Sequence, residues 1–319
     1  MKYFVGIDLG GTNIAVGVVD EEFRIVARAN RKTNSPRPAE QIADDMAAAT
    51  KDALAEAGLT MNNVEWVGIG TPGTVNQETG VIEYSNNLQF HNAPMIKLMQ
   101  ERLGVGVYME NDANAAIYGE ALAGAAKGVK NCIGITLGTG VGGGIIIDGR
   151  IYSGSNYAGA ELGHTVIVYD GKPCTCGRKG CFESYASATG LIAMTKECLQ
   201  ANPQDDMWKF ADGSLENVNG RTAFDAMRAG LASGKQVVDT YLNYLGCGLV
   251  NMINIFQPEI LFIGGGISKE GETILAPLRE YIERERYSKY AAKNTQLCVA
   301  QLGNDAGIIG AAFLGRLYA

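Results

Sequence analysis

The chain has 319 residues, of which 46% are hydrophobic and 19% are charged, a balance typical of globular proteins and sufficient for two domains with separate cores. Its net charge of −7 gives no electrostatic footprint for nucleic acid, and no apolar run approaches the roughly 20 residues that cross a bilayer. The first residues lack a signal-peptide pattern and the seven cysteines are an odd number, so we expect a protein of the reducing cytoplasm.

The first predicted element is a hairpin that recurs later in the chain. Residues 5–20 are typical of a strand, a Gly-rich turn and a second strand, and residues 133–148 repeat this pattern. The identical pairs are Gly6 and Gly134, Ile7 and Ile135, Leu9 and Leu137, Gly10 and Gly138, and Asp20 and Asp148. The alternative is chance similarity between two Gly-rich apolar hairpins. A true repeat predicts two related domains that face one another across a cleft.

Helices and strands alternate through the rest of the chain. We expect helices over residues 41–57, 94–103, 112–126, 188–200, 222–233, 235–256, 271–287 and 306–317, and strands over 64–70, 105–110, 260–263 and 296–300. Residues 202–220 are polar and lack periodicity, which indicates an exposed insertion. The alternation predicts α/β sheets covered on both faces. We place one domain at 1–115, joined by the final helix 306–319, and a larger one at 116–305.

The two Gly-rich turns are candidate phosphate sites. Glycines in the run Asp8 to Asn13 and at Gly138 and Gly140 let backbone N–H groups approach an anion without obstruction by side chains. Neither turn has the Walker or dinucleotide-binding pattern. Each alone could be a plain tight hairpin, but their recurrence favours a nucleotide, and Asp8 could direct the magnesium that accompanies ATP.

A cluster of one His and three Cys predicts a metal site. His164, Cys174, Cys176 and Cys181 have the unequal short spacings of a closed tetrahedral zinc site, which leaves no position for a catalytic water. The alternative is ordinary buried thiols. Glu161 and Glu183 flank these four residues, so the metal is expected to hold two loops that carry polar side chains to a ligand.

Asn111 and Asp112 come between a strand and a helix. One interpretation is that either residue is only the N-cap of that helix. The other is that Asp112 accepts the proton of an attacking hydroxyl, the one base that phosphoryl transfer requires. The Asn86–Asn87 pair is similarly ambiguous: a turn whose amides could bind a polyol.

Together these motifs resemble the ROK family of bacterial sugar kinases and repressors, within the actin–hexokinase–Hsp70 superfamily. The resemblance runs from Asp8 to Ala312, and residues 137–164 fit the family signature. It implies an α/β fold of two related actin/hexokinase-like (ribonuclease H-like) domains facing a central cleft. It also implies ATP, Mg²⁺ and a structural Zn²⁺ as cofactors, a small-molecule sugar as partner, neither nucleic acid nor membrane, and a homo-oligomer, dimer or tetramer.

The resemblance also implies roles for individual residues. Asp112 matches the catalytic base, and the matching sugar ligands are Gly73, Asn87, Asn111, Asp112, Glu161, His164 and Glu183. The matching nucleotide and magnesium positions are Asp8, Gly10, Gly11, Thr12 and Asn13, then Gly138 and Thr139, and finally the adenosine segment Gly264, Gly265 and Gly266. The zinc ligands match His164, Cys174, Cys176 and Cys181. His164 can serve both metal and sugar because imidazole has two nitrogens.

Two classes of function follow from the resemblance. The first is an ATP-dependent kinase for a hexose. Residues 183–189 resemble the run in glucokinases of the family, so we expect glucose; kinases for N-acetylmannosamine, allose, mannose or fructose are the alternatives. The second is a sugar-responsive regulator or sensor. Family repressors carry an N-terminal DNA-binding extension for which the seven residues before Asp8 leave no room.

Overall fold

The computed structural model describes residues 2–319 and divides them into two compact units. Unit 1 comprises the residues up to Ile133, Gly144–Ala160 and Ala300–Ala319, and unit 2 comprises Gly134–Gly143 and Glu161–Val299. The domain limits expected from the sequence stay a prediction. Among the described residues, no helix is both long and apolar enough to cross a membrane.

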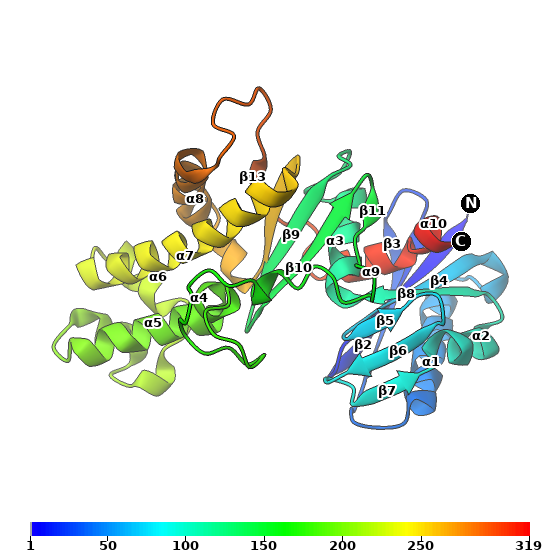
Figure 1. Ribbon diagram of the computed structural model, residues 1–319. Coiled ribbons are helices and arrows are strands. Elements are labelled where there is room, and N and C mark those ends of the chain that lie inside the picture. Colours follow the sequence, from blue (N-terminus) through cyan, green and yellow to red (C-terminus); the bar gives the residue numbers. More distant parts are fainter. Residues whose placement is uncertain (1) are drawn as a thin grey trace. The chain divides into compact units, whose positions relative to one another are not determined.

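The first sheet has five strands in the order β3-β2-β1-β4-β8 (Figure 1). The strands are β1 (Tyr3–Leu9), β2 (Asn13–Asp20), β3 (Ile25–Lys32), β4 (Val64–Thr71) and β8 (Gly106–Asn111). The hairpins β1–β2 and β2–β3 are antiparallel, whereas β4 is parallel to both β1 and β8. The carboxyl ends of the three parallel strands therefore meet at one edge of the sheet, which is where α/β proteins place their ligands.

The second sheet repeats this order. Its strands are β9 (Cys132–Leu137), β10 (Val141–Ile147), β11 (Arg150–Ile151), β12 (Ile260–Gly265) and β13 (Gln296–Val299), paired as β11-β10-β9-β12-β13. In both sheets the first strand of the hairpin is central and the two later strands follow beside it. The repeated hairpin thus belongs to a repeated sheet, and the predicted α/β fold class with two related halves is confirmed.

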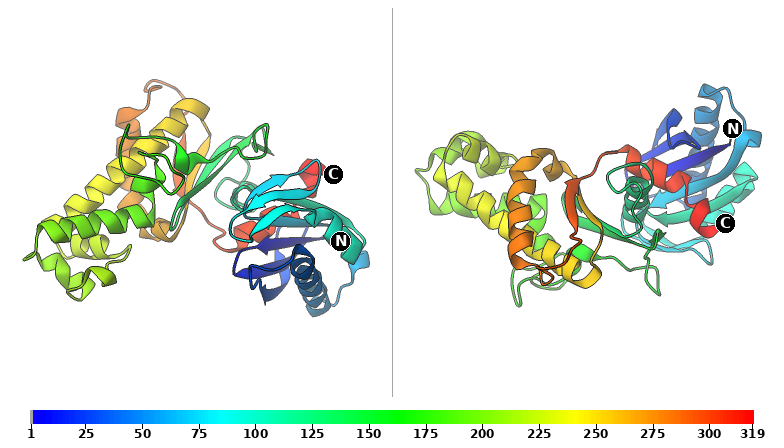
Figure 2. Two further views of the ribbon diagram at one scale, coloured as in Figure 1. Left: turned by 60° about the horizontal axis from the view of Figure 1, so that its bottom comes forward. Right: turned by 90° about the horizontal axis from the view of Figure 1, so that it is seen from above.

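The remaining elements are a small sheet and the helices of the two units. A small three-stranded sheet consists of β5 (Thr74–Asn76), β6 (Val81–Ser85) and β7 (Phe90–Ala93). The helices of unit 1 are α1 (Ala39–Glu56), α2 (Met95–Leu103), α3 (Asp112–Ala123), α9 (Asp305–Ala312) and α10 (Gly315–Tyr318). Those of unit 2 are α4 (Glu183–Ala186), α5 (Ala188–Ala201), α6 (Thr222–Arg228), α7 (Ala232–Phe256) and α8 (Glu272–Glu285), with α5, α6 and α8 packed against α7 (Figure 2).

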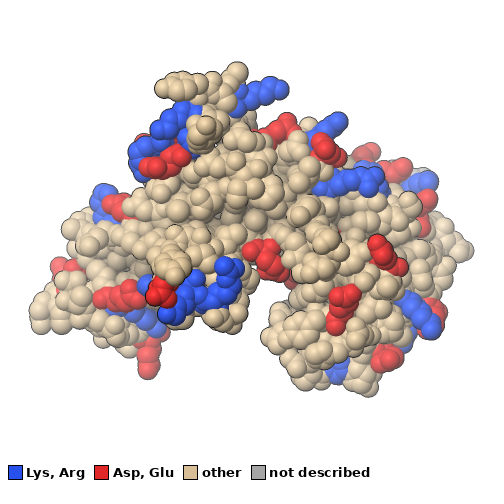
Figure 3. Space-filling view, viewed as in Figure 1, with Lys and Arg blue, Asp and Glu red and all other residues tan. Residues whose placement is uncertain are grey.

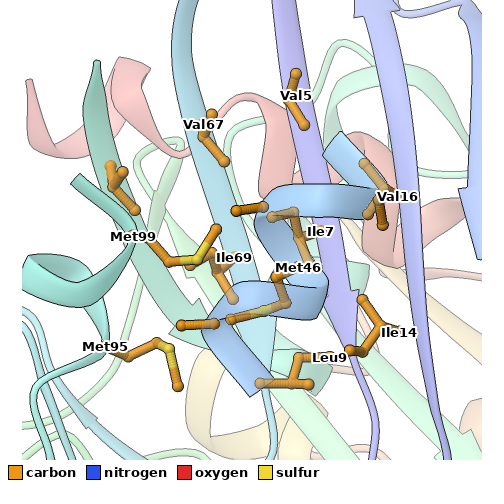
Figure 4. Close-up of a cluster of buried hydrophobic side chains, with 14 of the residues drawn as sticks. Val5, Ile7, Leu9, Ile14, Val16, Met46, Val67, Ile69, Met95 and Met99 are labelled. Carbon is orange, nitrogen blue, oxygen red and sulfur yellow. The ribbon is translucent and has the colours of Figure 1, made fainter. Parts of the chain in front are cut away.

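Alternation along β1 and β4 gives the first sheet two different faces. Val5, Ile7 and Leu9 of β1 are fully buried and join Met46 of α1 and Met99 of α2 in one hydrophobic cluster (Figure 4). The intervening positions include Gly6 of β1 and Gly68 of β4. These two glycines face α9, which packs against β1, β4 and α3.

Two glycines allow the close approach of α9. A Cβ atom on Gly6 would lie 1.9 Å from the carbonyl oxygen of Ile308, and one on Gly68 would lie 1.7 Å from that of Ala311. Both distances are far below van der Waals contact, so neither position accepts a side chain unless the helix moves.

Two expected helices have other limits than the sequence predicts. The helix expected over 222–233 ends at Arg228, because Gly230 is left-handed (φ 85°), and the next helix begins at Ala232. The helix expected over 306–317 is two helices, because Phe313 leaves helical geometry to pack against Phe4 and Phe23 at centroid distances of 4.6 and 4.7 Å.

Other differences concern segments that the sequence pattern does not resolve. Gly264 and Gly265 end strand β12 instead of following it. The segment 202–220 contains two short 3₁₀ helices and buries Met207, Ala211 and Val218, so it is not wholly exposed. The sequence pattern did not predict the strands β3, β5, β6, β7 and β11 or the one-turn helix α4. These elements are short or, in β3, half of the residues are polar.

We expect Gly68→Ala to lower the free energy of unfolding by about 2–3 kcal/mol, since the added methyl group collides with the backbone of α9. Gly106→Ala on the neighbouring strand β8 is the matched control, because its nearest contact would be an ordinary 3.5 Å. Calorimetric unfolding of both variants checks this. Equal transition temperatures for the two would contradict the packing argument.

Candidate functional site

The turn between β1 and β2 is the first part of the candidate site. The Gly10 N–H donates to the carbonyl oxygen of Asn13 at 2.9 Å, and the Thr33 hydroxyl donates to the carbonyl oxygen of Gly10 at 2.7 Å. A cavity of ≈ 670 Å³ adjoins this turn, and its walls include Asp8, Arg28 and Asp305. The turn is therefore a braced loop beside a space large enough for a charged ligand.

Asp8 and Asp112 are two partly buried carboxylates at the same edge of unit 1. Asp8 is near the end of β1 and Asp112 is the first residue of α3. Burial, with the charge of Asp112 added, raises the pKa of Asp8 to about 6. Burial also raises the pKa of Asp112, although backbone N–H groups at the start of α3 act against it. The pKa of each carboxyl group is thus closer to neutral pH than that of an ordinary carboxyl group, which is what a general base requires.

Asn111 joins the start of α3 to the Thr71–Gly73 turn. Its Oδ1 accepts from the N–H groups of Ala113 and Asn114 at 2.9 and 3.3 Å, so Asn111 is the N-cap of the helix. Its Nδ2 donates to the carbonyl oxygen of Gly73 at 3.2 Å. The structure therefore brings together three predicted sugar ligands, Gly73, Asn111 and Asp112.

Asn87 lies beside the first glycine turn. Its side chain is exposed, and its carbonyl oxygen accepts from the Ser35 hydroxyl at 3.0 Å. A Cβ atom on Gly11 would lie 3.3 Å from the same carbonyl oxygen. Asn87 is thus held through its backbone. Its side-chain amide makes no hydrogen bond to the described residues of unit 1.

The four predicted zinc ligands form one cluster in unit 2. Their ligand atoms all lie within 4.8 Å of one another. Cys174 Sγ is 3.6 Å from His164 Nδ1, and Cys176 Sγ is 3.7 Å from Cys181 Sγ. A tetrahedron with Zn–S bonds of about 2.3 Å has S–S edges of about 3.8 Å, so the donor set fits zinc in both type and spacing.

The thiols also show the electrostatics of a cation site. Burial alone would raise the pKa of Cys174, but hydrogen bonds within the cluster lower it to about 7. Burial and the neighbouring thiols raise the pKa of Cys181 to about 12. In this cluster one thiol ionises readily at the expense of another, and a divalent cation would allow all three to be thiolates.

Glu183 connects the zinc cluster to the second glycine turn. Its Oε2 accepts from the Val141 N–H at 2.9 Å, and its Oε1 is 3.8 Å from Cys174 Sγ. Within the turn, the Gly138 N–H donates to the carbonyl oxygen of Gly140 at 3.0 Å, and the Thr189 hydroxyl donates to the carbonyl oxygen of Thr139 at 2.7 Å. If the cluster has a structural role, its contact with Glu183 would therefore also stabilise this turn.

The other predicted residues of unit 2 lie near these parts. Glu161 is exposed and precedes the 3₁₀ helix Leu162–His164. Gly265 has φ 85°, and a Cβ atom there would lie 2.4 Å from the carbonyl oxygen of Leu137, the residue before the second glycine turn. The segment Gly264–Gly266 is therefore packed beside that turn.

Sequence reasoning missed several residues of the site. Arg28 and Asn30 of β3 line the cavity at the first turn, and Arg28 forms a 2.7 Å ion pair with Asp305 across 277 residues of sequence. A basic residue on an edge strand carries no local signal for such a role. On the face shown in Figure 3, Lys and Arg alternate with Asp and Glu, so charge density alone does not mark the site either.

The fold and the site are those of actin/hexokinase-like proteins. Two sheets have the same strand order, and in each a glycine turn joins the first two strands of the sheet. Comparison with known proteins adds the family, because residues 4–316 match the ROK family. The chain belongs to the ROK family, and the resemblance seen in its sequence is confirmed.

Similar proteins share nearly the full length of the chain. A glucokinase of Streptomyces coelicolor is 36% identical, with 99% of this chain and 98% of the relative covered. A ROK family glucokinase of Streptomyces griseus, solved in complex with glucose and AMPPNP, is 38% identical, covers 99% of each chain and has a TM-score of 0.78. The ROK hexokinase of Thermus thermophilus is 32% identical, with 99% and 98% of the chains covered and a TM-score of 0.82.

We expect the purified protein to hold about one zinc ion per chain and Cys176→Ser to lose it, because three ligands cannot close the tetrahedron. Cys247→Ser, in α7 and outside the cluster, is the control and should keep the metal. Elemental analysis of the dialysed proteins measures the content. Zinc retained by Cys176→Ser would contradict the assigned ligand set.

Proposed function

We propose that this protein is an ATP-dependent glucokinase that transfers the γ-phosphoryl group to the 6-hydroxyl of glucose. The observation that carries the proposal is the pair of partly buried carboxylates Asp8 and Asp112, which interact electrostatically. Asp8 also lines the cavity at the first glycine turn. The full-length similarity to the Streptomyces glucokinases supports the choice of substrate and donor.

In this proposal Asp112 is the general base. Its carboxylate accepts the proton of the attacking hydroxyl, and its raised pKa makes it a better base than an ordinary Asp. Asn111 and Gly73, already joined by a hydrogen bond, bind sugar hydroxyls next to it. The other proposed sugar contacts are Asn87, Glu161, His164 and Glu183.

The glycine turns hold the phosphates. The N–H groups of Gly11, Thr12 and Asn13 in the first turn, and of Thr139 in the second, are the proposed donors, with Gly264–Gly266 as the adenosine segment. Transfer through such an arrangement relies on positioning and charge neutralisation more than on covalent chemistry by the protein.

Two metals complete the proposal. Asp8 would hold Mg²⁺, which neutralises charge on the transferring phosphates when bound. His164, Cys174, Cys176 and Cys181 would hold a structural Zn²⁺ that keeps Glu183 and the second glycine turn in place. We also propose a homo-oligomer, dimer or tetramer, located in the cytoplasm.

The substrate is tested by measuring ADP formation from Mg-ATP with glucose, mannose, N-acetylmannosamine, allose and fructose offered separately. We expect kcat/KM for glucose to exceed that for each other sugar by at least about tenfold, since a sugar with differently placed polar groups leaves buried polar groups of the site unpaired. Preference for another sugar would overturn the substrate and keep the kinase. Sugar binding without turnover of any sugar would favour a sensor.

We expect Asp112→Asn to lower kcat by about 10³-fold while the glucose dissociation constant stays within about tenfold, because the amide keeps the hydrogen bonds and loses the base. Asp239→Asn, an exposed substitution in α7, is the control. Coupled-assay kinetics and calorimetric binding measure the two quantities. An unchanged kcat would show that Asp112 is not the base.

Asp112→Asn should also affect the stability of the protein. The pKa of Asp112 is raised in the folded protein, so its ionised form, present at neutral pH, costs stability that protonation at low pH restores. Asp112→Asn removes that cost, and we expect its melting temperature at pH 7 to equal or exceed that of the wild type. A clear decrease at pH 7 would contradict the direction of the pKa shift.

A further inference from the structure

Glu110 is a buried carboxylate for which the proposed function has no role. It is the penultimate residue of β8, directly before Asn111 and Asp112, and only 2% of it is exposed. Charge buried to this degree is stable only when hydrogen bonds compensate for lost hydration. Its contacts in unit 1 are therefore informative.

Five neutral donors surround the Glu110 carboxylate. Oε1 accepts from the N–H of Asn111 at 2.8 Å and from Nδ2 of Asn114 at 3.1 Å. Oε2 accepts from the Tyr318 hydroxyl at 2.6 Å, from the Ser153 hydroxyl at 3.2 Å and from Nε2 of Gln77. Within residues 2–319 no Lys, Arg or His forms a recorded ion pair with Glu110, so oriented dipoles alone hold its charge.

The two carboxylate oxygens have different tasks. Oε1 binds the strand–helix junction from which Asp112 projects, since both of its donors belong to residues flanking Asp112. Oε2 binds groups that come from elsewhere in unit 1: Tyr318 of α10, Gln77 after β5 and Ser153 after β11. The rigid planar carboxylate thus couples the orientation of the junction to these three anchors.

Tyr318 takes part in two of the hydrogen bonds of this network. Its hydroxyl also accepts from Nε2 of Gln77 at 2.8 Å, which closes a triangle with Oε2 of Glu110. Burial and the charge of Glu110 raise the pKa of Tyr318, so the phenol keeps its proton throughout the physiological range. It is therefore a permanent donor to the carboxylate.

We propose that Glu110, oriented by Tyr318 and Gln77, is a positioning residue that sets the geometry of Asn111 and Asp112 for phosphoryl transfer. This inference rests on the proposed function, in which Asp112 is the base. Catalytic groups must be held within a fraction of an ångström of their productive position, and the groups behind them provide that constraint. A purely structural network would instead affect stability and leave the kinetic constants unchanged.

The test is Tyr318→Phe, which removes one hydroxyl and keeps the ring. We expect kcat to fall by about tenfold while the glucose dissociation constant, measured without ATP, stays within about twofold. Tyr290→Phe makes the same chemical change on a fully exposed tyrosine and should match the wild type. A kcat equal to that of Tyr290→Phe would overturn the inference, as would a loss of glucose affinity equal to the loss of kcat.

Substitutions of Glu110 test the same inference if Tyr318→Phe does not fold. Glu110→Gln keeps one acceptor and the side-chain volume, and we expect it to lower kcat by about 10²-fold. Glu110→Asp should also lower kcat, because its shorter side chain cannot reach both sets of donors. If Tyr318 acts through Glu110, the double variant Glu110→Gln/Tyr318→Phe loses no more than Glu110→Gln alone. Multiplicative losses would contradict that coupling.

The outcomes separate this inference from the proposed function. A wild-type chain that phosphorylates glucose, with a Tyr318→Phe variant as active as Tyr290→Phe, removes the positioning role only. A wild-type chain that phosphorylates none of the sugars tested removes the proposed function and, with it, the role assigned to Glu110.

Discussion

The close approach of α9 to the first sheet is the constraint on which the site of unit 1 depends. At Gly6 and Gly68 the backbone of α9 occupies the space of a side chain. A Cβ atom on Gly310 would lie 1.7 Å from the carbonyl oxygen of Ala115, so α9 approaches α3 as closely as it approaches the sheet. The same packing seats Asp8 against the first turn of α9, where a Cβ atom on Gly307 would be 3.1 Å from its Oδ2. Small residues thus let the first sheet, α3 and α9 pack close together, and polar side chains at the ends of these elements lie near one another.

The carboxylates at this edge of the sheet lie in two contrasting environments. Glu110 accepts hydrogen bonds from five neutral donors and is fixed in place. Asp112 accepts from the Ala113 N–H at 2.9 Å, but burial still raises its pKa, as it raises that of Asp8. A difference in environment between neighbouring titratable groups is how one site assigns separate roles to chemically similar side chains. In this account Glu110 supports the geometry, whereas Asp8 and Asp112 are available to bind a cation and to accept a proton.

The parts of the site that could be predicted are those encoded locally. The glycine turns and the His–Cys cluster each lie within a short stretch of sequence, and residue types at fixed spacing limit what they can form. Asn111 shows where such reasoning stops: it is the N-cap of α3, as the simpler interpretation held, and its amide also reaches Gly73. The ion pair of Arg28 with Asp305 and the contact of Tyr318 with Glu110 join residues 277 and 208 positions apart. No local pattern carries these contacts, because they exist only once α9 and α10 have packed. The end of the last long helix was misjudged for the same reason, since Phe313 follows tertiary packing instead of helical propensity.

The most direct test of the central claim is a crystal structure of the protein with glucose, Mg²⁺ and AMPPNP. The account predicts a carboxylate oxygen of Asp112 within about 2.6–3.2 Å of the glucose 6-hydroxyl, with that hydroxyl directed at the γ-phosphate. It also predicts the side chains of Asn111 and Glu110 in the contacts described above. Glucose bound with its 6-hydroxyl away from Asp112, or with another side chain in that position, would contradict the assignment of Asp112 as the base.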